Sequence, residues 1–152
     1  MQLSEQWVLV TGGARGLGQS ITRALAREGA GVVINYLHSD AAAQALAEEL
    51  GPRALALQAD VTDAAAVQRL FAQVRERTGQ PISAVVNNAL AQFRFDGDAR
   101  PQIGDITWQR FAQQLEGAVK GALNTTQAAL PAMRAQGFGR IVTVGTHLFQ
   151  NP

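Results

Sequence analysis

Short apolar runs alternate with longer segments of helical periodicity, and this alternation constrains the fold more than any other feature of the sequence. The apolar runs are nearly unbroken, which is typical of strands buried on both faces, as in a parallel sheet. They cover residues 8–10, 32–34, 54–57, 84–86 and 141–144. Between them, apolar residues recur every three or four positions, which indicates amphipathic helices. The sequence therefore predicts an α/β fold: a Rossmann-like, doubly wound parallel sheet with three α/β/α layers.

The element boundaries agree with this pattern. Glycine follows each of four helical segments, where it can adopt the left-handed conformation that ends a helix. These glycines are Gly29, Gly51, Gly79 and Gly137. Thr62 or Asp63 can cap the third helix, and Thr107 can cap a long helix over about 107–136. We expect residues 1–152 to form one domain of this fold.

Composition excludes several classes of protein. The 13 basic and 12 acidic residues give a net charge of +1, so no basic face is expected to bind nucleic acid. The absence of cysteine excludes disulfides, thiolate metal sites and cysteine nucleophiles, and we expect no metal site. No apolar run approaches the roughly 20 residues of a membrane span, and the N-terminus does not resemble a signal peptide. We expect a soluble, cytoplasmic protein.

A glycine-rich loop, Thr-Gly-Gly-Ala-Arg-Gly-Leu-Gly at 11–18, joins the first strand to the first helix. A helix N-terminus offers unpaired N–H donors and a positive dipole end, which together suit a pyrophosphate. A side chain at Gly12 or Gly16 would block its approach, whereas Gly18 would let the helix pack closely on its strand. The spacing differs from the G-x-G-x-x-G fingerprint, and a tight turn without a ligand is the alternative. The expected cofactor contacts in this loop are Thr11, Gly12, Arg15, Gly16, Leu17 and Gly18.

The end of the second strand bears on which dinucleotide binds. Sites selective for NAD place a carboxylate there to bind the ribose 2′-hydroxyl. Here residues 35–39, between the strand end and Asp40, contain no carboxylate that would repel a 2′-phosphate. Arg15 could pair with that phosphate, the alternative being a solvated surface residue. The sequence favours NADP(H), with Asn35, Tyr36 and Ser39 at this end of the site.

Four motifs in this order resemble the short-chain dehydrogenase/reductase family, from Trp7 to the end of the chain. They are the loop 11–18, Asp60-Val61, Asn87-Asn88-Ala89 and Gly139-Arg140-Ile141-Val142. The Asn35-Tyr36 pair and the arginine of the loop make the sequence most similar to the 3-oxoacyl-(acyl-carrier-protein) reductases.

The resemblance implies roles for the motifs that follow the third and fourth strands. Asp60 would accept a hydrogen bond from the adenine amino group, and Val61 would pack beside the ring. Asn87 would brace the centre of the sheet, Asn88 would lie beside the cofactor, and Ala89 would line the ribose pocket. The alternatives are a helix-capping carboxylate for Asp60 and a polar turn for the asparagine pair.

The catalytic residues of the family are only partly matched. A tyrosine and a lysine four residues apart are expected on the helix after the fifth strand, but the only tyrosine is Tyr36. The family's catalytic serine aligns with Thr146, which we take as the candidate catalytic residue; the alternative is a β-branched residue at a strand end. His147 is expected to be a loop residue. Ala118 replaces an asparagine, and Leu90 replaces a glycine and could narrow the cleft.

The resemblance implies an oxidoreductase that transfers a hydride between NADP(H) and a carbonyl or secondary alcohol. The substrate could be a 3-oxoacyl thioester linked to acyl carrier protein. We expect the chain to be truncated after its fifth strand, with the tyrosine and lysine supplied beyond Pro152, and to be inactive alone. The alternative is a catalytically silent NADP(H)-binding or sensor subunit. The family also implies homodimers or homotetramers, in which the helix at 107–136 would pack against its copy.

Overall fold

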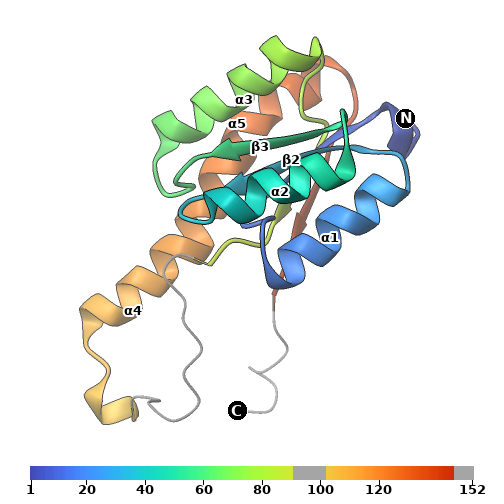
Figure 1. The fold of residues 1–152 in the computed structure, drawn as a ribbon. Coiled ribbons are helices and arrows are strands. Elements are labelled where there is room, and N and C mark those ends of the chain that lie inside the picture. The colour runs from blue at the N-terminus through green and yellow to red at the C-terminus, as the bar shows by residue number, and fades with distance from the viewer. Residues whose placement is uncertain (91–101, 146–152) are drawn as a thin grey trace.

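The computed structural model describes residues 1–90 and 102–145, in which five parallel strands form one sheet (Figure 1). The strand order is β3-β2-β1-β4-β5. The bounds are β1 Trp7–Val10, β2 Gly31–Tyr36, β3 Ala54–Gln58, β4 Ala84–Asn87 and β5 Arg140–Thr143. The three central strands are buried along their whole length, which explains their unbroken apolar character. The predicted parallel sheet is confirmed.

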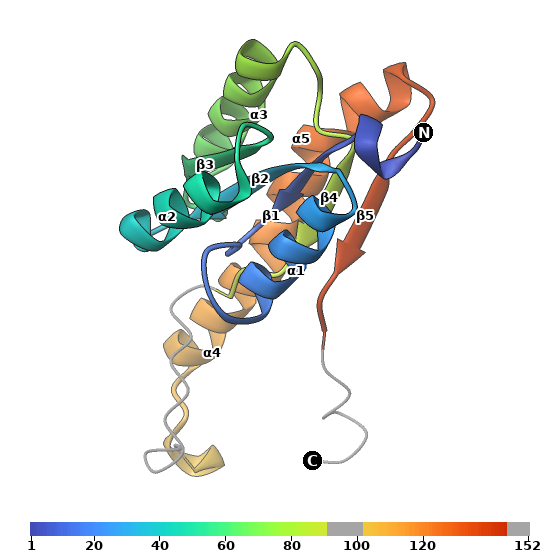
Figure 2. The ribbon, with the colours of Figure 1, turned by 45° about the vertical axis from the view of Figure 1, so that its right-hand side comes forward.

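Helices cover both faces of the sheet, which confirms the three-layer prediction (Figure 2). The helices α1 and α2 lie on one face, and α3 and α5 lie on the other. The bounds are α1 Gly16–Arg27, α2 Asp40–Leu50, α3 Ala64–Thr78, α4 Trp108–Leu115 and α5 Gly121–Ala135. Short 3-10 helices occupy Leu3–Glu5 and Ile103–Asp105. In both ribbon views, α4 extends away from the sheet, beyond the carboxyl ends of the strands.

The predicted helix ends have the expected geometry. The four glycines named above all have positive φ angles. Asp63, not Thr62, caps α3, because its carboxylate accepts from the Ala65 N–H at 2.8 Å. Thr107 caps α4 through a 3.3 Å bond from the Arg110 N–H. The long helix predicted from Thr107 is interrupted: a π-helical turn, Glu116–Lys120, joins α4 to α5.

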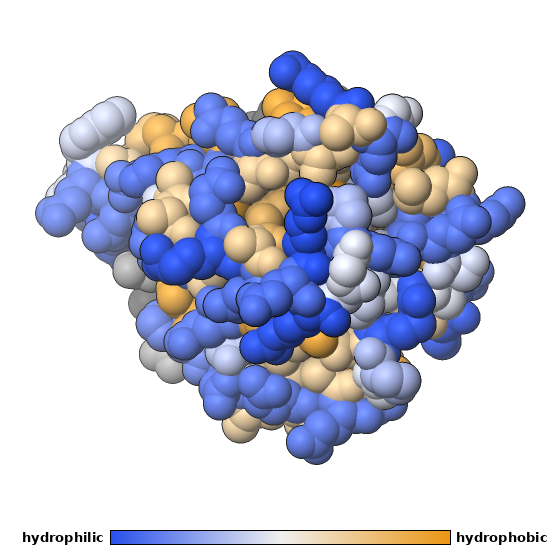
Figure 3. All heavy atoms as spheres, turned by 90° about the horizontal axis from the view of Figure 1, so that it is seen from above, coloured by the Kyte–Doolittle hydropathy of each residue, from blue (hydrophilic) through white to orange (hydrophobic). Residues whose placement is uncertain are grey.

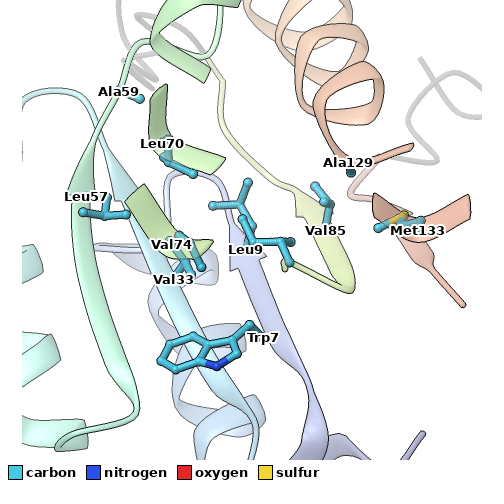
Figure 4. Packing of buried hydrophobic residues seen from close by; sticks show 11 residues of the cluster. Trp7, Leu9, Val33, Leu57, Ala59, Leu70, Val74, Val85, Ala129 and Met133 are labelled. Carbon is cyan, nitrogen blue, oxygen red and sulfur yellow. The ribbon is translucent and has the colours of Figure 1, made fainter. Parts of the chain in front are cut away.

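The largest apolar cluster lies between the sheet and the helices α3 and α5 (Figure 4). Leu9 and Val85 of the central strands meet Leu70 and Val74 of α3, and Ala129 of α5 closes the same layer. Two smaller clusters pack α1 and α2 against the opposite face. Since both faces of the central strands are covered, only loops and strand ends are left to form a site.

The surface is mostly polar where Figure 3 shows it, with apolar residues scattered between charged ones. Within residues 1–90 and 102–145, no helix combines the length and the apolar character needed to cross a membrane.

Candidate functional site

A cavity of about 280 Å³ lies at the carboxyl ends of the central strands. In an open parallel sheet, ligands bind in the crevice outside these ends, where the strand order reverses. Here the order reverses at β1, which lies between β2 and β4. Nine of the residues predicted from the sequence line the cavity: Gly12, Arg15, Asn35, Tyr36, Ser39, Asp60, Val61, Asn88 and Ala89.

The glycine-rich loop forms one wall of the cavity, and its glycines are required for different reasons. Gly12 and Gly16 have φ angles of +62° and +52°, a region that favours glycine. A Cβ atom at Gly12 would also lie 3.2 Å from the Ala89 Cα, whereas one at Gly16 would meet open space. At Gly18 it would lie 2.2 Å from the Gly12 carbonyl oxygen. Gly18 therefore lets the start of α1 pack closely against the loop that follows β1.

The start of α1 can receive an anion. Arg15 is its N-cap residue, and the Arg15 side chain makes no capping hydrogen bond. The first N–H groups of a helix have no partner within the helix, and they carry the positive end of its dipole. Two carbonyl groups of the loop accept hydrogen bonds from side chains of the protein. The Thr22 hydroxyl donates to the Gly13 oxygen at 3.3 Å, and the Asn88 amide donates to the Gly12 oxygen at 3.4 Å.

Thr11 ties the loop to the end of β4. Its Oγ1 accepts from the backbone N–H groups of Asn88 and Ala89, both at 2.9 Å, and donates to the Val86 oxygen at 3.3 Å. In return, the Asn88 side-chain amide donates to the Thr11 carbonyl oxygen at 2.9 Å. Thr11 is almost fully buried, so these bonds are shielded from water. Thr11 positions the cavity wall from behind and does not line the cavity.

Asn35 ties the loop to β2 and β3. Its Oδ1 accepts from the Gly12 N–H at 3.4 Å, and its Nδ2 donates to the Ala59 carbonyl at 2.9 Å. The residue is 2% exposed. Its amide is thus committed to shaping the cavity, although the sequence suggested only a cofactor contact.

The segment after β2 forms another part of the cavity wall. Tyr36, Leu37, His38 and Ser39 line the cavity together with Arg15 of the glycine-rich loop. The Tyr36 hydroxyl donates to the Asp40 carboxylate, and Asp40 itself does not line the cavity. This hydrogen bond, with a smaller contribution from burial, raises the pKa of Tyr36 above its ordinary value.

Asp60 and Val61 follow β3 in the sequence, and both line the cavity. The Asp60 Oδ1 accepts from the backbone N–H of Thr62 at 2.8 Å and from its hydroxyl at 2.7 Å. Asp60 therefore stabilises the turn that precedes α3, and both of these bonds use the same carboxylate oxygen. Val61 is buried and provides an apolar surface beside it.

Asn87 lies behind the main cavity and lines a smaller one, of about 50 Å³. Its Oδ1 accepts from the Thr125 hydroxyl at 2.6 Å, which links the end of β4 to α5. Ala118, on the π-helical turn, lines the same small cavity and brings no polar side chain to it. Leu90 lines both cavities and is 55% exposed.

Several predicted residues do not line the main cavity. Thr11 and Asn87 line the smaller one, while Gly16, Leu17 and Gly18 line neither. Thr146 and His147 lie outside the described residues. The sequence analysis did not select Ala14, Leu37, His38 and Ala59, which also line the cavity. Their adjacency to selected residues in the same strand-end loops is the signal that could have identified them.

The cavity suits a dinucleotide. Its lining includes Arg15, which is the N-cap residue of α1, and apolar residues at Ala59, Val61 and Ala89. In the part of the chain that the structure describes, no group of three or more His, Asp or Glu side chains could hold a metal ion.

Comparison with known proteins adds a family match. Residues 6–152 match the model of the short chain dehydrogenase family. The chain is 40% identical over 139 residues to a sorbitol dehydrogenase of Cereibacter sphaeroides, covering 91% of this chain and 51% of that protein. It is 34% identical over 142 residues to the 3-oxoacyl-[acyl-carrier-protein] reductase FabG of Staphylococcus aureus, covering 91% and 54%. The chain thus spans about half the length of the curated relatives that it matches.

The Thr11 network gives a stability prediction. Thr11→Val removes the oxygen that accepts from two backbone N–H groups, so unfolding free energy should fall by about 1–3 kcal/mol. Thr11→Ser retains the oxygen and should lose clearly less. Urea denaturation followed by circular dichroism measures both variants. Unchanged stability in Thr11→Val would contradict the prediction, and equal losses in the two variants would show that the methyl group of Thr11 contributes as much as its hydrogen bonds.

The Tyr36–Asp40 contact gives a pH prediction. Because Tyr36 is the only tyrosine in the chain, its phenolate absorbance can be titrated without overlap from another phenol. Asp40→Asn removes the charge that stabilises the neutral phenol, so Tyr36 should ionise at lower pH than in the wild type. The raised pKa means that this contact stabilises the fold at neutral pH and ceases to do so as pH rises through the folded-state pKa. Asp63→Asn, which removes the carboxylate that caps α3, should leave the titration unchanged.

Proposed function

Because the chain belongs to the short-chain dehydrogenase family, we propose that the protein is an oxidoreductase that transfers a hydride between NADP(H) and a carbonyl or secondary alcohol. The observation that carries the proposal is the cavity at the switch point of the sheet, where the glycine-rich loop and the uncapped start of α1 meet Arg15. Nicotinamide cofactors supply the hydride chemistry, and the protein binds and orients them.

The proposed binding mode assigns one part of the cofactor to each wall. The pyrophosphate lies on the N–H groups at the start of α1, where the missing side chain of Gly16 leaves open space, while Gly12 allows the loop to lie against Ala89. The adenine ring packs beside Val61, with Asp60 as a hydrogen-bond acceptor for its amino group. Ala89 lines the ribose pocket. These are the roles that the family resemblance implies.

Selectivity for NADP(H) is the part of this proposal that rests on charge. Arg15, His38 and Ser39 all line the cavity, and we place the 2′-phosphate beside Arg15. A guanidinium forms strong, charge-assisted hydrogen bonds with phosphate. Among the described residues that line this cavity, Asp60 is the only acidic one, and it is assigned to the adenine amino group.

The proposed substrate class is based on the names of two relatives. One relative is named a reductase of a 3-oxoacyl group on acyl carrier protein, and another a dehydrogenase of sorbitol. Both names describe the interconversion of a carbonyl and an alcohol, so we take a ketone or secondary alcohol as the substrate class and a 3-oxoacyl thioester as the first to test. Thr146 would hold the carbonyl oxygen, and the tyrosine and lysine of the family would lie outside these 152 residues.

A catalytically silent NADP(H)-binding subunit is the second candidate. Two departures from the family motivate it: Ala118 lies where the family has an asparagine, and Thr146 where it has a serine. Reduction of a ketone by the protein with NADPH would decide against this candidate.

We also propose that the protein associates with a second copy of itself through α4, the π-helical turn and α5. An apolar stripe follows one side of this helix: Trp108, Phe111, Leu115, Val119 and Leu123, with exposed fractions from 43% to 75%. Exposed neighbours of opposite charge, Glu116 and Lys120, could pair across a two-fold axis. A contiguous apolar surface of this kind marks an interaction site.

Arg15→Ala tests the cofactor proposal. Loss of one charge-assisted contact should weaken NADPH binding by about tenfold or more, while NADH binding changes by less than about twofold. Isothermal titration calorimetry measures both affinities. Arg27→Ala, at an exposed position in the last turn of the same helix, is the matched control and should change neither. Equal losses for both cofactors in Arg15→Ala would show that Arg15 does not contact the 2′-phosphate.

Phe111→Glu tests the association proposal. A charge in the middle of the stripe should convert a dimer into a monomer in sedimentation velocity, because a carboxylate is costly to bury without a partner. Gln113→Glu introduces the same side chain on the same helix, outside the stripe, and should leave the dimer intact. A wild-type chain that sediments only as a monomer at all concentrations would contradict the proposal.

A further inference from the structure

The only tyrosine of the chain holds a carboxylate beside the cavity. Tyr36 is the last residue of β2, and its ring is buried among Ile34, Ala43 and Leu46. Its hydroxyl donates to the Asp40 Oδ1, and the Gln44 side-chain amide donates to the same oxygen at 3.4 Å. A buried ring is a rigid support, so the hydroxyl fixes where the exposed carboxylate lies.

The position of this carboxylate is significant because Asp40 follows the cavity wall directly. Residues 36–39 all line the cavity, and Asp40 is the next residue but does not. It is the first residue of α2, where a negative charge is favoured by the helix dipole. The Tyr36 hydroxyl and the start of α2 therefore hold the charge together, at a residue that does not line the cavity.

A carboxylate at this end of a dinucleotide site has opposite effects on the two cofactors. It can accept a hydrogen bond from a ribose 2′-hydroxyl, but it repels a 2′-phosphate. Arg15 lines the same cavity, and its guanidinium would attract the phosphate. The preference for one cofactor thus depends on whether the Asp40 charge faces the cavity or is held outside it.

We propose that Tyr36 is a positioning residue for cofactor selectivity: its hydroxyl keeps the Asp40 carboxylate turned away from the cavity, so that a 2′-phosphate can bind beside Arg15. The proposal rests on the proposed dinucleotide function and adds a specificity determinant to it. It differs from a direct contact, because the hydroxyl acts through Asp40 and not on the cofactor.

Tyr36→Phe is the central test, since it removes the hydroxyl and leaves the buried ring. Affinities for NADPH and NADH, measured by calorimetry on the 152-residue chain, give the selectivity ratio. We expect the ratio to shift about three- to tenfold toward NADH, through weaker NADPH binding. Gln44→Ala removes the longer contact to the same oxygen and retains the phenol, so its ratio should stay within about twofold of the wild type. Circular dichroism confirms that each variant is folded.

The double variant Tyr36→Phe/Asp40→Asn separates this mechanism from a direct one. If the hydroxyl acts through the charge of Asp40, removing that charge as well should restore the preference for NADPH. A ratio that stays shifted in the double variant would overturn the proposal, because the hydroxyl would then contact the phosphate directly. An unchanged ratio in Tyr36→Phe alone would also overturn it.

The proposed function and this inference fail in different ways. Wild-type protein that binds neither cofactor would contradict the dinucleotide site itself, and the inference would fall with it. Wild-type protein that binds NADPH through Arg15, but whose selectivity does not respond to Tyr36→Phe, would contradict the inference alone.

Discussion

The parallel pairing of β1 with β2 and β4 is the constraint on which the candidate site depends. Val10 lies opposite Ile34 in one neighbour and Val86 in the other, so all three strands reach the same edge in step. The chain then leaves the sheet at Thr11, at the segment after Tyr36 and at the asparagine pair that begins with Asn87. Residues far apart in the sequence thereby become neighbours around one cavity, although each is placed by its own strand.

Hydrogen bonds from polar side chains fix the relative positions of the loops that surround the cavity. Thr11, Asn35 and Asn88 each bond to backbone groups of a different segment, and together they join the glycine-rich loop to the ends of β3 and β4. An asparagine suits this purpose because its amide presents both an acceptor and two donors. Residues of this kind resemble ligand-binding residues in a sequence, yet much of their hydrogen-bonding capacity is used by the protein itself.

The sequence predicted the order of strands and helices well, because hydrophobic periodicity and glycine helix ends are local signals. It also located most of the cavity lining, since parallel strand ends must share an edge. It did not predict the directions of side chains. The amide of Asn35 bonds to the backbone of Gly12 and Ala59, and the Tyr36 hydroxyl donates to Asp40. The π-helical turn at Glu116–Lys120 was also missed, because nothing in the local pattern of apolar residues distinguishes it from an α-helix. The roles of the cavity residues remain predictions.

The hydrogen bonds that shape the glycine-rich loop have a consequence for recognition. Hydrogen bonds within the protein hold this loop in place, and they involve Thr11, Thr22, Asn35 and Asn88. The conformational entropy of ordering these glycines is therefore a cost of folding and not of association. A ligand would meet a preorganised surface whose backbone needs little movement, as is common in complexes between rigid partners. Mutations that remove these hydrogen bonds should therefore weaken ligand binding, even where the mutated residue does not contact the ligand.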